Sequence, residues 1–416
     1  MNETRPLVQA PPEEAGEGKP PATGLDQLYH TPLFQIPRST SNLLRPDIER
    51  FLEYSRIFYN AEWYTNNGPV ARMLERRLAE FHQVEHCLVF SSGFWAIALA
   101  MKHLARDGRD EVIMPSLTYR RMADIAAWVP LKPHYCEVDP TTLAMTPDAV
   151  EASITDRTAL ILGVHPIVNC ADAAALEAVA EKHGIPILFD SVESVFETSG
   201  NARVGGFGAA ECFSLHACKL INGFGGGYLT SNDADLVRTL ASQRNFGFTG
   251  PDEIGTPGGL NAKLNEIHAA MALASLDGLK DQVALNRVRY EAYATLLADL
   301  DGIDLVAFDE NQTPGYKNIV AKVTEAWPYT CAETIERLNA ENILARAYYA
   351  PPLHLKSAHI PHVAHGLTGT ETLAEMYMNL PCGQRVSVAD IEEIVGFLRS
   401  LKDSADQAHG HPEATP

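Results

Sequence analysis

The sequence has few basic residues and lacks any long apolar run. Of its 416 residues, 33 are lysine or arginine and 53 are aspartate or glutamate, so the formal net charge is -20. A chain without a basic stripe is a poor match for nucleic-acid backbones or anionic membranes, and neither is expected as a partner. The longest apolar run, residues 94–101, is far shorter than the roughly 20 residues that span a bilayer. An anionic substrate stays possible, because local charge governs a site.

Paired cysteines are also lacking. The seven cysteines are an odd number, are spread through apolar runs and show no C-x-x-C pair. This usage is typical of reduced, buried thiols and not of a disulfide framework. Cys212, His216 and Cys218 lie close along the chain but lack the spacing of zinc ligands, so no metal site is expected. No signal-peptide pattern is seen either, and these features together predict a cytoplasmic protein.

Length and composition predict two domains between two tails. Hydrophobic residues make up 46% and charged residues 21% of the chain, as in soluble globular proteins. The chain exceeds the roughly 250–300 residues that one core usually serves. Residues 1–24 are rich in Pro, Glu, Gly and Ala without periodicity and are predicted to be disordered, as are residues 403–416. We expect a large domain over residues 25–285 and a small one over 286–402.

Strand and helix patterns alternate through the large domain. Apolar strands are expected at residues 87–90, 111–114, 134–138, 160–164 and 185–189. A helix is predicted to begin at Pro69, and another, from about Asp172, to end at Gly184. Repeated units of this kind predict an α/β fold with a mostly parallel sheet between helices, in which ligands lie beyond the carboxyl ends of the strands. The pattern after residue 286 indicates an α+β unit that closes with a helix over residues 388–401.

The stretch from Ser214 to Gly227, SLHACKLINGFGGG, carries the main chemical hypothesis. It places Lys219 after an apolar strand and before a glycine cluster, an arrangement that suits a covalent imine between a lysine and an aldehyde. A solvated surface lysine is the ordinary alternative. Asp190 strengthens the hypothesis, because a carboxylate directly after an apolar strand needs a cationic or protonated partner.

A second candidate feature lies after the strand at residues 87–90. The strand runs into Ser91, Ser92 and Gly93, and a helix of small residues follows from Phe94. A strand, a Ser/Gly turn and a helix present free backbone N–H groups to a phosphate. A plain turn between strand and helix is the alternative interpretation of the same residues.

Gly93, Asp190, Ser214 and Lys219 together resemble a pyridoxal 5'-phosphate site. The chain resembles the DegT/DnrJ/StrS family of sugar aminotransferases, which have the aspartate-aminotransferase fold, fold type I of the pyridoxal-phosphate-dependent transferases. The resemblance extends over about residues 33–401 and rests on motifs that occur in the family's order. These are WYTNNGP, SSGFWA, DEVIMPSLTY, VH, FDS, FSLHACK, GGGYLTSND, RNFG, GLNAKLNEIHAA, YYAPPLH and NLPCG.

The resemblance implies a role for each matching residue. Lys219 would form the Schiff base with pyridoxal phosphate and later act as the general base, and Asp190 would keep the pyridine nitrogen protonated. Tyr119 would stack on the ring. The phosphate would be held by the backbone of Gly93 and Phe94 and by the hydroxyl of Ser214.

Asn261 matches the asparagine that reaches the phosphate in the neighbouring subunit, which implies a homodimer with shared sites. Several of these residues also have simpler explanations. Tyr119 could be an ordinary half-buried aromatic, Ser214 could face solvent, and Asn261 could cap its helix. His165 is interpreted as structural, and His216 and His354 as residues that line the site.

Three positions depart from the family pattern. Glu193 stands where the family usually has Gln or His beside the phenolic oxygen of the cofactor, and would affect the protonation of the Schiff base. Gly225 stands where the family usually has an acid, and Phe94 replaces a small hydroxyl residue.

The resulting prediction is a ping-pong aminotransferase that moves an amino group from glutamate or glutamine to a keto-sugar, expected to be nucleotide-linked. A divergent member that catalyses elimination, decarboxylation or cyclisation is the main alternative. A non-catalytic binding or regulatory protein is a third, which the retention of Lys219 and Asp190 disfavours.

Overall fold

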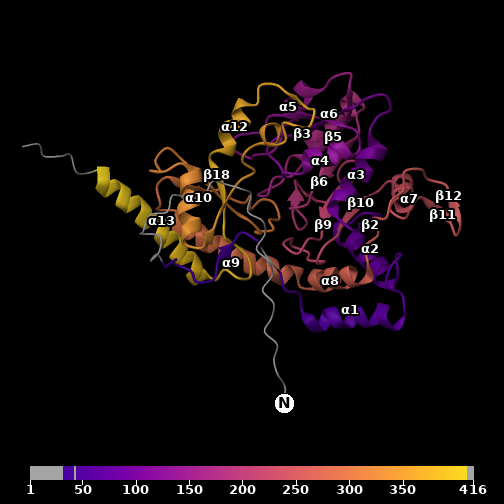
Figure 1. The fold of residues 1–416 in the computed structure, drawn as a ribbon, viewed down its shortest axis with the longest axis horizontal. Helices are drawn as coiled ribbons and strands as arrows, with labels where there is room; N and C mark the ends of the chain where they lie inside the picture. The colour runs from indigo at the N-terminus through magenta and orange to yellow at the C-terminus, as the bar shows by residue number, and fades with distance from the viewer. Residues whose placement is uncertain (1–30, 42–43, 410–416) are drawn as a thin grey trace, which may run out of the picture.

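The computed structural model describes residues 31–41 and 44–409. The tail predicted over residues 1–24 and the last residues of the C-terminal tail, 410–416, lie outside these ranges. Figure 1 shows a large domain, coloured indigo to salmon, with a smaller orange and yellow unit at its side. In the described parts of the chain, no helix is both long enough and apolar enough to cross a membrane.

An eight-stranded sheet forms the centre of the large domain, in the order β17-β4-β3-β5-β6-β9-β10-β2. Its strands are β2 (His86–Phe90), β3 (Glu111–Pro115), β4 (Lys132–Cys136), β5 (Thr158–Val164), β6 (Ile187–Asp190), β9 (Ala210–Ser214), β10 (Gly227–Ser231) and β17 (Val363–Ala364). Neighbouring strands are parallel except where β10 pairs with β9 and β2. The predicted α/β fold with a mostly parallel sheet is confirmed.

Helices cover both faces of this sheet, because its strands are apolar on both. Val112 and Met114 of β3 pack into one core cluster, while Ile113 between them packs into the other. The first cluster is closed by α3 (Gly93–Leu104), α4 (Met122–Trp128) and α7 (Ala234–Gln243), and the second by α2 (Pro69–His82), α5 (Pro147–Ser153), α6 (Ala173–His183) and α8 (Glu266–Asp277). Burial on both faces explains the near-continuous apolar strands of the sequence.

Two helix ends lie where the sequence placed them. Pro69 is the first residue of α2, where its missing N–H is not needed. Asp172 caps α6, and Gly184 ends it with a left-handed φ of 57°. That conformation places little strain on glycine and satisfies the last carbonyl groups of the helix.

The C-terminal unit combines helices with a four-stranded antiparallel sheet. The helices are α9 (Leu279–Leu297), α10 (Cys331–Ala340) and α13 (Val388–His409), and the strand order is β13 (Ile303–Leu305), β14 (Ile319–Val323), β18 (Tyr377–Leu380) and β16 (Arg346–Ala347). Because α13 continues to His409, the prediction of a tail is wrong for residues 403–409. Ala405 is buried there and extends the apolar face of the helix.

The two units exchange segments, which the sequence-based boundaries did not anticipate. Helix α9 crosses the boundary predicted at residue 285 without a break. Strand β17 joins the large sheet beside β4, and β1 (Arg38–Ser39) pairs with β15 (Ile343–Leu344) of the C-terminal unit. Residues from both units therefore meet beside the carboxyl ends of the large sheet.

The remaining elements lie at the periphery. Helix α1 (Ile48–Asn60) lies along α8, as Figure 1 shows, and the short helices are α11 (Leu353–Lys356) and α12 (Thr368–Ala374). Two small hairpins are formed by β7 (Thr198–Ser199) with β8 (Ala202–Arg203) and by β11 (Phe248–Gly250) with β12 (Glu253–Ile254). The second hairpin lies between α7 and α8.

Candidate active site

Three of the predicted site residues meet at one edge of the large sheet. Asp190 is the last residue of β6, and Ser214 is the last residue of the neighbouring strand β9. Gly93 begins α3 beside them, since a Cβ at this position would lie 3.5 Å from the Cβ of Ser214. Carboxyl ends of adjacent parallel strands are the usual place for ligands in such sheets.

Lys219 lies in the turn that follows β9. Its backbone N–H donates to His216 O at 2.8 Å, and its Nζ donates to Glu193 Oε1. The side chain is only 15% exposed. Burial lowers the pKa of Lys219, but the charge and hydrogen bond of Glu193, together with Cys218 and Asp190, outweigh burial, so the net shift of the pKa is upward. Lys219 is thus held as an ammonium ion by a specific carboxylate.

Glu193 binds a second lysine, which the sequence analysis missed. Lys317 Nζ donates to Glu193 Oε2, so each carboxylate oxygen accepts from a different ammonium group. Burial favours the neutral carboxyl, yet the two lysines outweigh it and lower the pKa of Glu193 to about 2. Lys317 lies just before β14 in the C-terminal unit, and a lysine two residues before a strand gave no specific signal in the sequence.

Asp190 is buried without a cation of its own. It is 5% exposed, and its Oδ1 accepts one backbone hydrogen bond, from Val192 N at 3.2 Å. Burial raises the pKa of Asp190 to about 6, although the Val192 N–H and the charge of Lys219 lower it in part. A protonated ring nitrogen placed against this carboxylate would supply the missing partner.

His165 lies behind this strand end and takes a structural position. Its ring stacks on Phe189 with centroids 5.4 Å apart, and its Nδ1 accepts from Ala171 N at 3.2 Å. Burial lowers the pKa of His165 to about 4, so the imidazole is neutral at physiological pH. The histidine supports the strand that carries Asp190.

The start of α3 fits tightly against the β9–β10 pair. Ser92 caps the helix, with its Oγ accepting from Trp95 N at 3.3 Å. A Cβ at Gly227 would lie 2.3 Å from Gly93 N, so glycine is required for this approach. Ser214 Oγ accepts from His216 N at 3.2 Å, and a hydroxyl that accepts once can still donate. Helix N–H groups and a hydroxyl donor together suit a phosphate.

Two tyrosines lie close to each other beside the site, Tyr119 exposed and Tyr349 largely buried. Tyr119 is 48% exposed, which leaves its ring available for stacking. Tyr349, which the sequence analysis did not single out, is near the same acids. Burial raises the pKa of Tyr349, with further contributions from the charge of Glu193 and from Asp190 and Tyr119.

The C-terminal segment is fixed to the loop that carries Tyr119. Ser116 Oγ and His354 Nδ1 are 2.7 Å apart, and Leu353 N donates to Ser116 O at 2.9 Å. His354 Nε2 lies 3.0 Å from Glu371 Oε1. The histidine that was expected to line the site therefore holds two segments together.

Phe94 and Asn261 are the remaining predicted cofactor-binding residues. Phe94 is in the first turn of α3, with its ring 5.2 Å from that of Trp95. Asn261 is exposed and forms a β-bridge with Asn245. The cap of α8 is Asn265, so the interpretation of Asn261 as a helix cap is wrong. A contact of Asn261 with a second subunit stays a prediction.

The arrangement matches what pyridoxal phosphate needs. Lys219 would offer an amine to the aldehyde, Asp190 a buried carboxylate to the pyridine nitrogen, and the glycine-lined start of α3 a cradle for the phosphate. Among the described residues, no cluster of three His, Cys, Asp or Glu side chains is arranged to hold a metal ion. All seven cysteines are free thiols.

Comparison with known proteins decides the family. Residues 47–399 match the model of the DegT/DnrJ/EryC1/StrS aminotransferase family. The chain belongs to this family. It is therefore a pyridoxal-phosphate-dependent aminotransferase with the fold expected from its sequence.

Individual relatives cover most of the chain. The dTDP-4-amino-4,6-dideoxy-D-glucose transaminase of Shigella dysenteriae is 28% identical, over 86% of this chain and 97% of its own length. The L-glutamine:2-deoxy-scyllo-inosose aminotransferase of Micromonospora echinospora is 30% identical, over 84% of this chain and 89% of its own length. The structure of DesI with its TDP-sugar product superposes with a TM-score of 0.85 at 30% identity, covering 92% of this chain and 98% of DesI.

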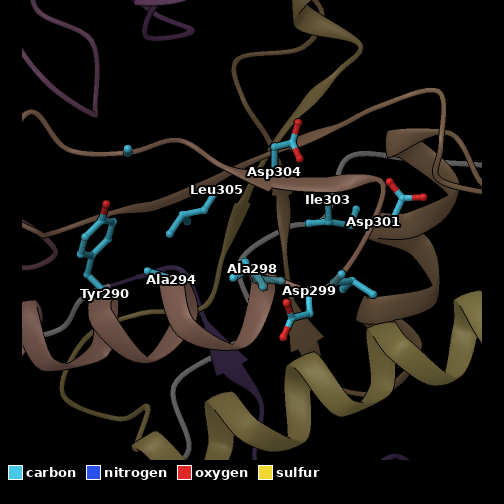
Figure 2. A pocket seen from close by; sticks show the side chains of 11 residues that line it. Tyr290, Ala294, Ala298, Asp299, Asp301, Ile303, Asp304 and Leu305 are labelled. Atoms are coloured by element: carbon cyan, nitrogen blue, oxygen red, sulfur yellow. The ribbon is translucent and has the colours of Figure 1, made fainter.

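The aminotransferase also has a hollow in its C-terminal unit, away from the predicted residues. Figure 2 shows this hollow, of about 620 Å³, between α9 and β13. Asp299, Asp301 and Asp304 line it, and none of the predicted site residues does. Its lining contains no lysine that could form an imine with an aldehyde, so the chemistry is assigned to the sheet edge near Lys219.

Proposed function

We propose that this aminotransferase transfers an amino group from glutamate or glutamine to a keto-sugar, and that the acceptor is nucleotide-linked. The main support is the placement of Asp190 at the end of β6 and of Lys219 in the turn after the neighbouring strand β9, beside the phosphate cradle at Gly93. The Shigella relative and DesI, named for a dTDP-sugar and a TDP-sugar, favour a nucleotide sugar. The Micromonospora relative, named for glutamine, favours that donor.

Pyridoxal phosphate, when bound, acts as an electron sink that stabilises negative charge on the substrate carbon. The residues supply position and proton transfer. Lys219 Nζ would hold the cofactor at its aldehyde, and the amine would move the proton at the substrate carbon as general base. Asp190 would keep the ring nitrogen protonated, and Tyr119 would stack on the ring. The first turn of α3 and Ser214 would bind the phosphate.

Another pyridoxal-phosphate reaction is the second candidate, and Glu193 is the observation that favours it. An ionised carboxylate next to Lys219 changes the protonation of the reacting nitrogen. Such a change would suit elimination, decarboxylation or cyclisation as well as amino transfer. The amino-donor half-reaction separates the two candidates.

The test is an absorption titration of the purified protein loaded with pyridoxal phosphate. Borohydride should fix the cofactor to the peptide that contains Lys219, and glutamate or glutamine should convert the bound cofactor to its amine form. Lys219→Ala is the control and should show neither reaction. A cofactor that is fixed at Lys219 but unchanged by either donor would favour the second candidate. Full activity of Lys219→Ala would refute both.

We also propose a cytoplasmic homodimer in which Asn261 completes the site of the partner subunit. The free thiols of all seven cysteines support a reducing compartment. The exposed position of Asn261 near the end of β2 leaves it available to a second subunit, since its neighbour Ala262 accepts from Ser91 N at 2.7 Å.

Mixing two inactive variants tests the shared site. Lys219→Ala and Asn261→Ala should each be inactive alone. After subunit exchange, mixed dimers would contain one intact site, and random pairing would restore about a quarter of the wild-type activity. No recovery in dimers shown to have exchanged subunits would refute a shared site.

A further inference from the structure

The two lysines on Glu193 come from different parts of the chain. Lys219 follows β9 of the large domain, and Lys317 precedes β14 of the C-terminal unit. Each donates to its own oxygen of the same carboxylate. All three side chains are largely buried, with exposures of 15% for Lys219, 7% for Lys317 and 16% for Glu193. The charges therefore act on one another with little screening by water.

The other titratable groups around Lys219 favour its charged form and so act in the opposite direction to Lys317. Asp190 and Cys218 face Lys219 in addition to Glu193, and both act to raise its pKa. Lys317 is therefore the cation, among the residues that the structure describes, that counters these groups through Glu193.

Apart from the two lysines, the titratable groups around Glu193 are carboxyl groups, phenols and one thiol. They are Asp190, Glu197, Tyr348, Tyr349 and Cys382. None of these side chains can carry a positive charge. Burial raises the pKa of Glu197 to about 7, so this carboxyl is partly neutral at physiological pH.

We propose that Lys317 is a positioning residue that sets the acid–base behaviour of Lys219 by sharing the Glu193 carboxylate with it. The inference rests on the proposed role of Lys219 as the reactive amine. An amine reacts with an aldehyde only in its neutral form. With Lys317 on the second oxygen, Glu193 holds the Lys219 ammonium less strongly, and a larger fraction of Lys219 is neutral near physiological pH.

The charges around Lys219 predict the order in which the variants ease its deprotonation. In Lys317→Met, Glu193 has one cation left, and the repulsion between the two ammonium groups is lost, so Lys219 becomes harder to deprotonate. In Glu193→Gln, two buried ammonium groups lie together without their carboxylate, and Lys219 becomes easiest to deprotonate. The double variant removes both effects and should lie between Glu193→Gln and the wild type. A purely structural role of Lys317 predicts no such order.

The experiment measures Lys219 in cofactor-free protein. Acetic anhydride labels neutral amines, and mass spectrometry of the Lys219 peptide gives its labelling rate between pH 6 and 10. At pH 8, we expect Lys317→Met to slow labelling of Lys219 by about tenfold and Glu193→Gln to speed it by at least as much, the sizes expected of single buried charges. Lys317→Arg keeps the charge and should label like the wild type.

Lys322→Met is the matched control. Lys322 lies in β14, five residues along the chain from Lys317, and points instead to the ring of Tyr377 at 5.9 Å. Its removal should leave the labelling of Lys219 unchanged. Should Lys317→Met fail to fold, Lys317→Gln removes the same charge with a smaller change in polarity, and the same slowing is expected.

Labelling of Lys219 that is unchanged or faster without Lys317 would overturn the inference. The pH dependence of the rate of pyridoxal phosphate binding gives a second readout, and its midpoint should move upward in Lys317→Met. One outcome separates this inference from the proposed function. If the wild type and the variants show the expected order of labelling rates but borohydride fixes no cofactor at Lys219, the proposed function fails while the charge relation between the three side chains stands.

Discussion

Replacing Asp190 by asparagine should stabilise the cofactor-free protein at neutral pH while weakening its hold on the cofactor. Asp190 is 5% exposed and has no cation of its own. Burial raises its pKa from 3.8 to about 6. The folded protein thus binds this proton more tightly than the unfolded chain does. A neutral amide at this position would avoid the burial of a charge and could still accept the hydrogen bond from Val192 N.

The raised pKa of Asp190 also gives the size of the stability difference between wild type and variant, and the pH range in which it develops. For a carboxyl with a raised pKa, stability is fully present below the unfolded value near 4 and is lost as pH rises through the folded value near 6. A shift of about two units corresponds to about 3 kcal/mol. The variant should match the wild type at pH 4 and exceed its free energy of unfolding by about 3 kcal/mol above pH 7.

Urea unfolding of the cofactor-free proteins from pH 4 to 8 measures this difference. Asp304→Asn, a change of the same kind at an exposed carboxylate in β13, is the control and should follow the wild type at every pH. With pyridoxal phosphate added, we expect the wild type to be more stable than Asp190→Asn. Pairing of the ring nitrogen with Asp190 should raise the melting temperature of the wild type more than that of the variant. A constant difference between wild type and Asp190→Asn across this pH range would refute the reasoning.

Two further substitutions test the packing around the site. Gly227→Ala places a Cβ 2.3 Å from Gly93 N, so it should cost about 1–3 kcal/mol in urea unfolding and weaken cofactor binding, whereas Gly225→Ala meets nothing within 4 Å and should change neither. Equal effects of Gly227→Ala and Gly225→Ala would contradict the role of the close contact between Gly227 and Gly93 in binding the phosphate. Glu266 accepts from Val70 N at 2.7 Å at the start of α2, so Glu266→Ala should cost about 1–3 kcal/mol, with Glu266→Gln losing less.

The sequence predicted the strand ends because their signals are local. A parallel strand buried on both faces is apolar throughout, and a polar residue after it marks the end of the strand. Asp190 follows this rule at the end of β6, and the pairing of β6 with β9 places Ser214, the last residue of β9, at the same edge of the sheet. Pro69 and Gly184 mark helix ends through their own backbone preferences.

Features that depend on distant parts of the chain could not be predicted in this way. Lys317 is separated from Glu193 by strands β7 to β13 and by the three helices α7, α8 and α9, and only the folded chain shows that both reach one point. Tyr349 and β17 are brought to the large domain in the same manner. The extension of α13 beyond residue 402 depends on the burial of Ala405, which a single alanine in a polar stretch does not indicate.

One electrostatic rule explains why both Glu193 and Asp190 are tolerated at this buried edge of the sheet. Glu211, buried behind them, accepts from Gly205 N at 2.6 Å and from Phe207 N at 2.8 Å, yet burial still raises its pKa to about 7. Hydrogen bonds alone therefore do not keep a carboxylate ionised at this depth. Glu193 is ionised because two ammonium groups contact it, and Asp190 requires a cation that none of the described residues places in contact with it. A protonated pyridine nitrogen would meet this requirement, so the rule that assigns Lys317 to Glu193 leads us to expect the cofactor ring at Asp190.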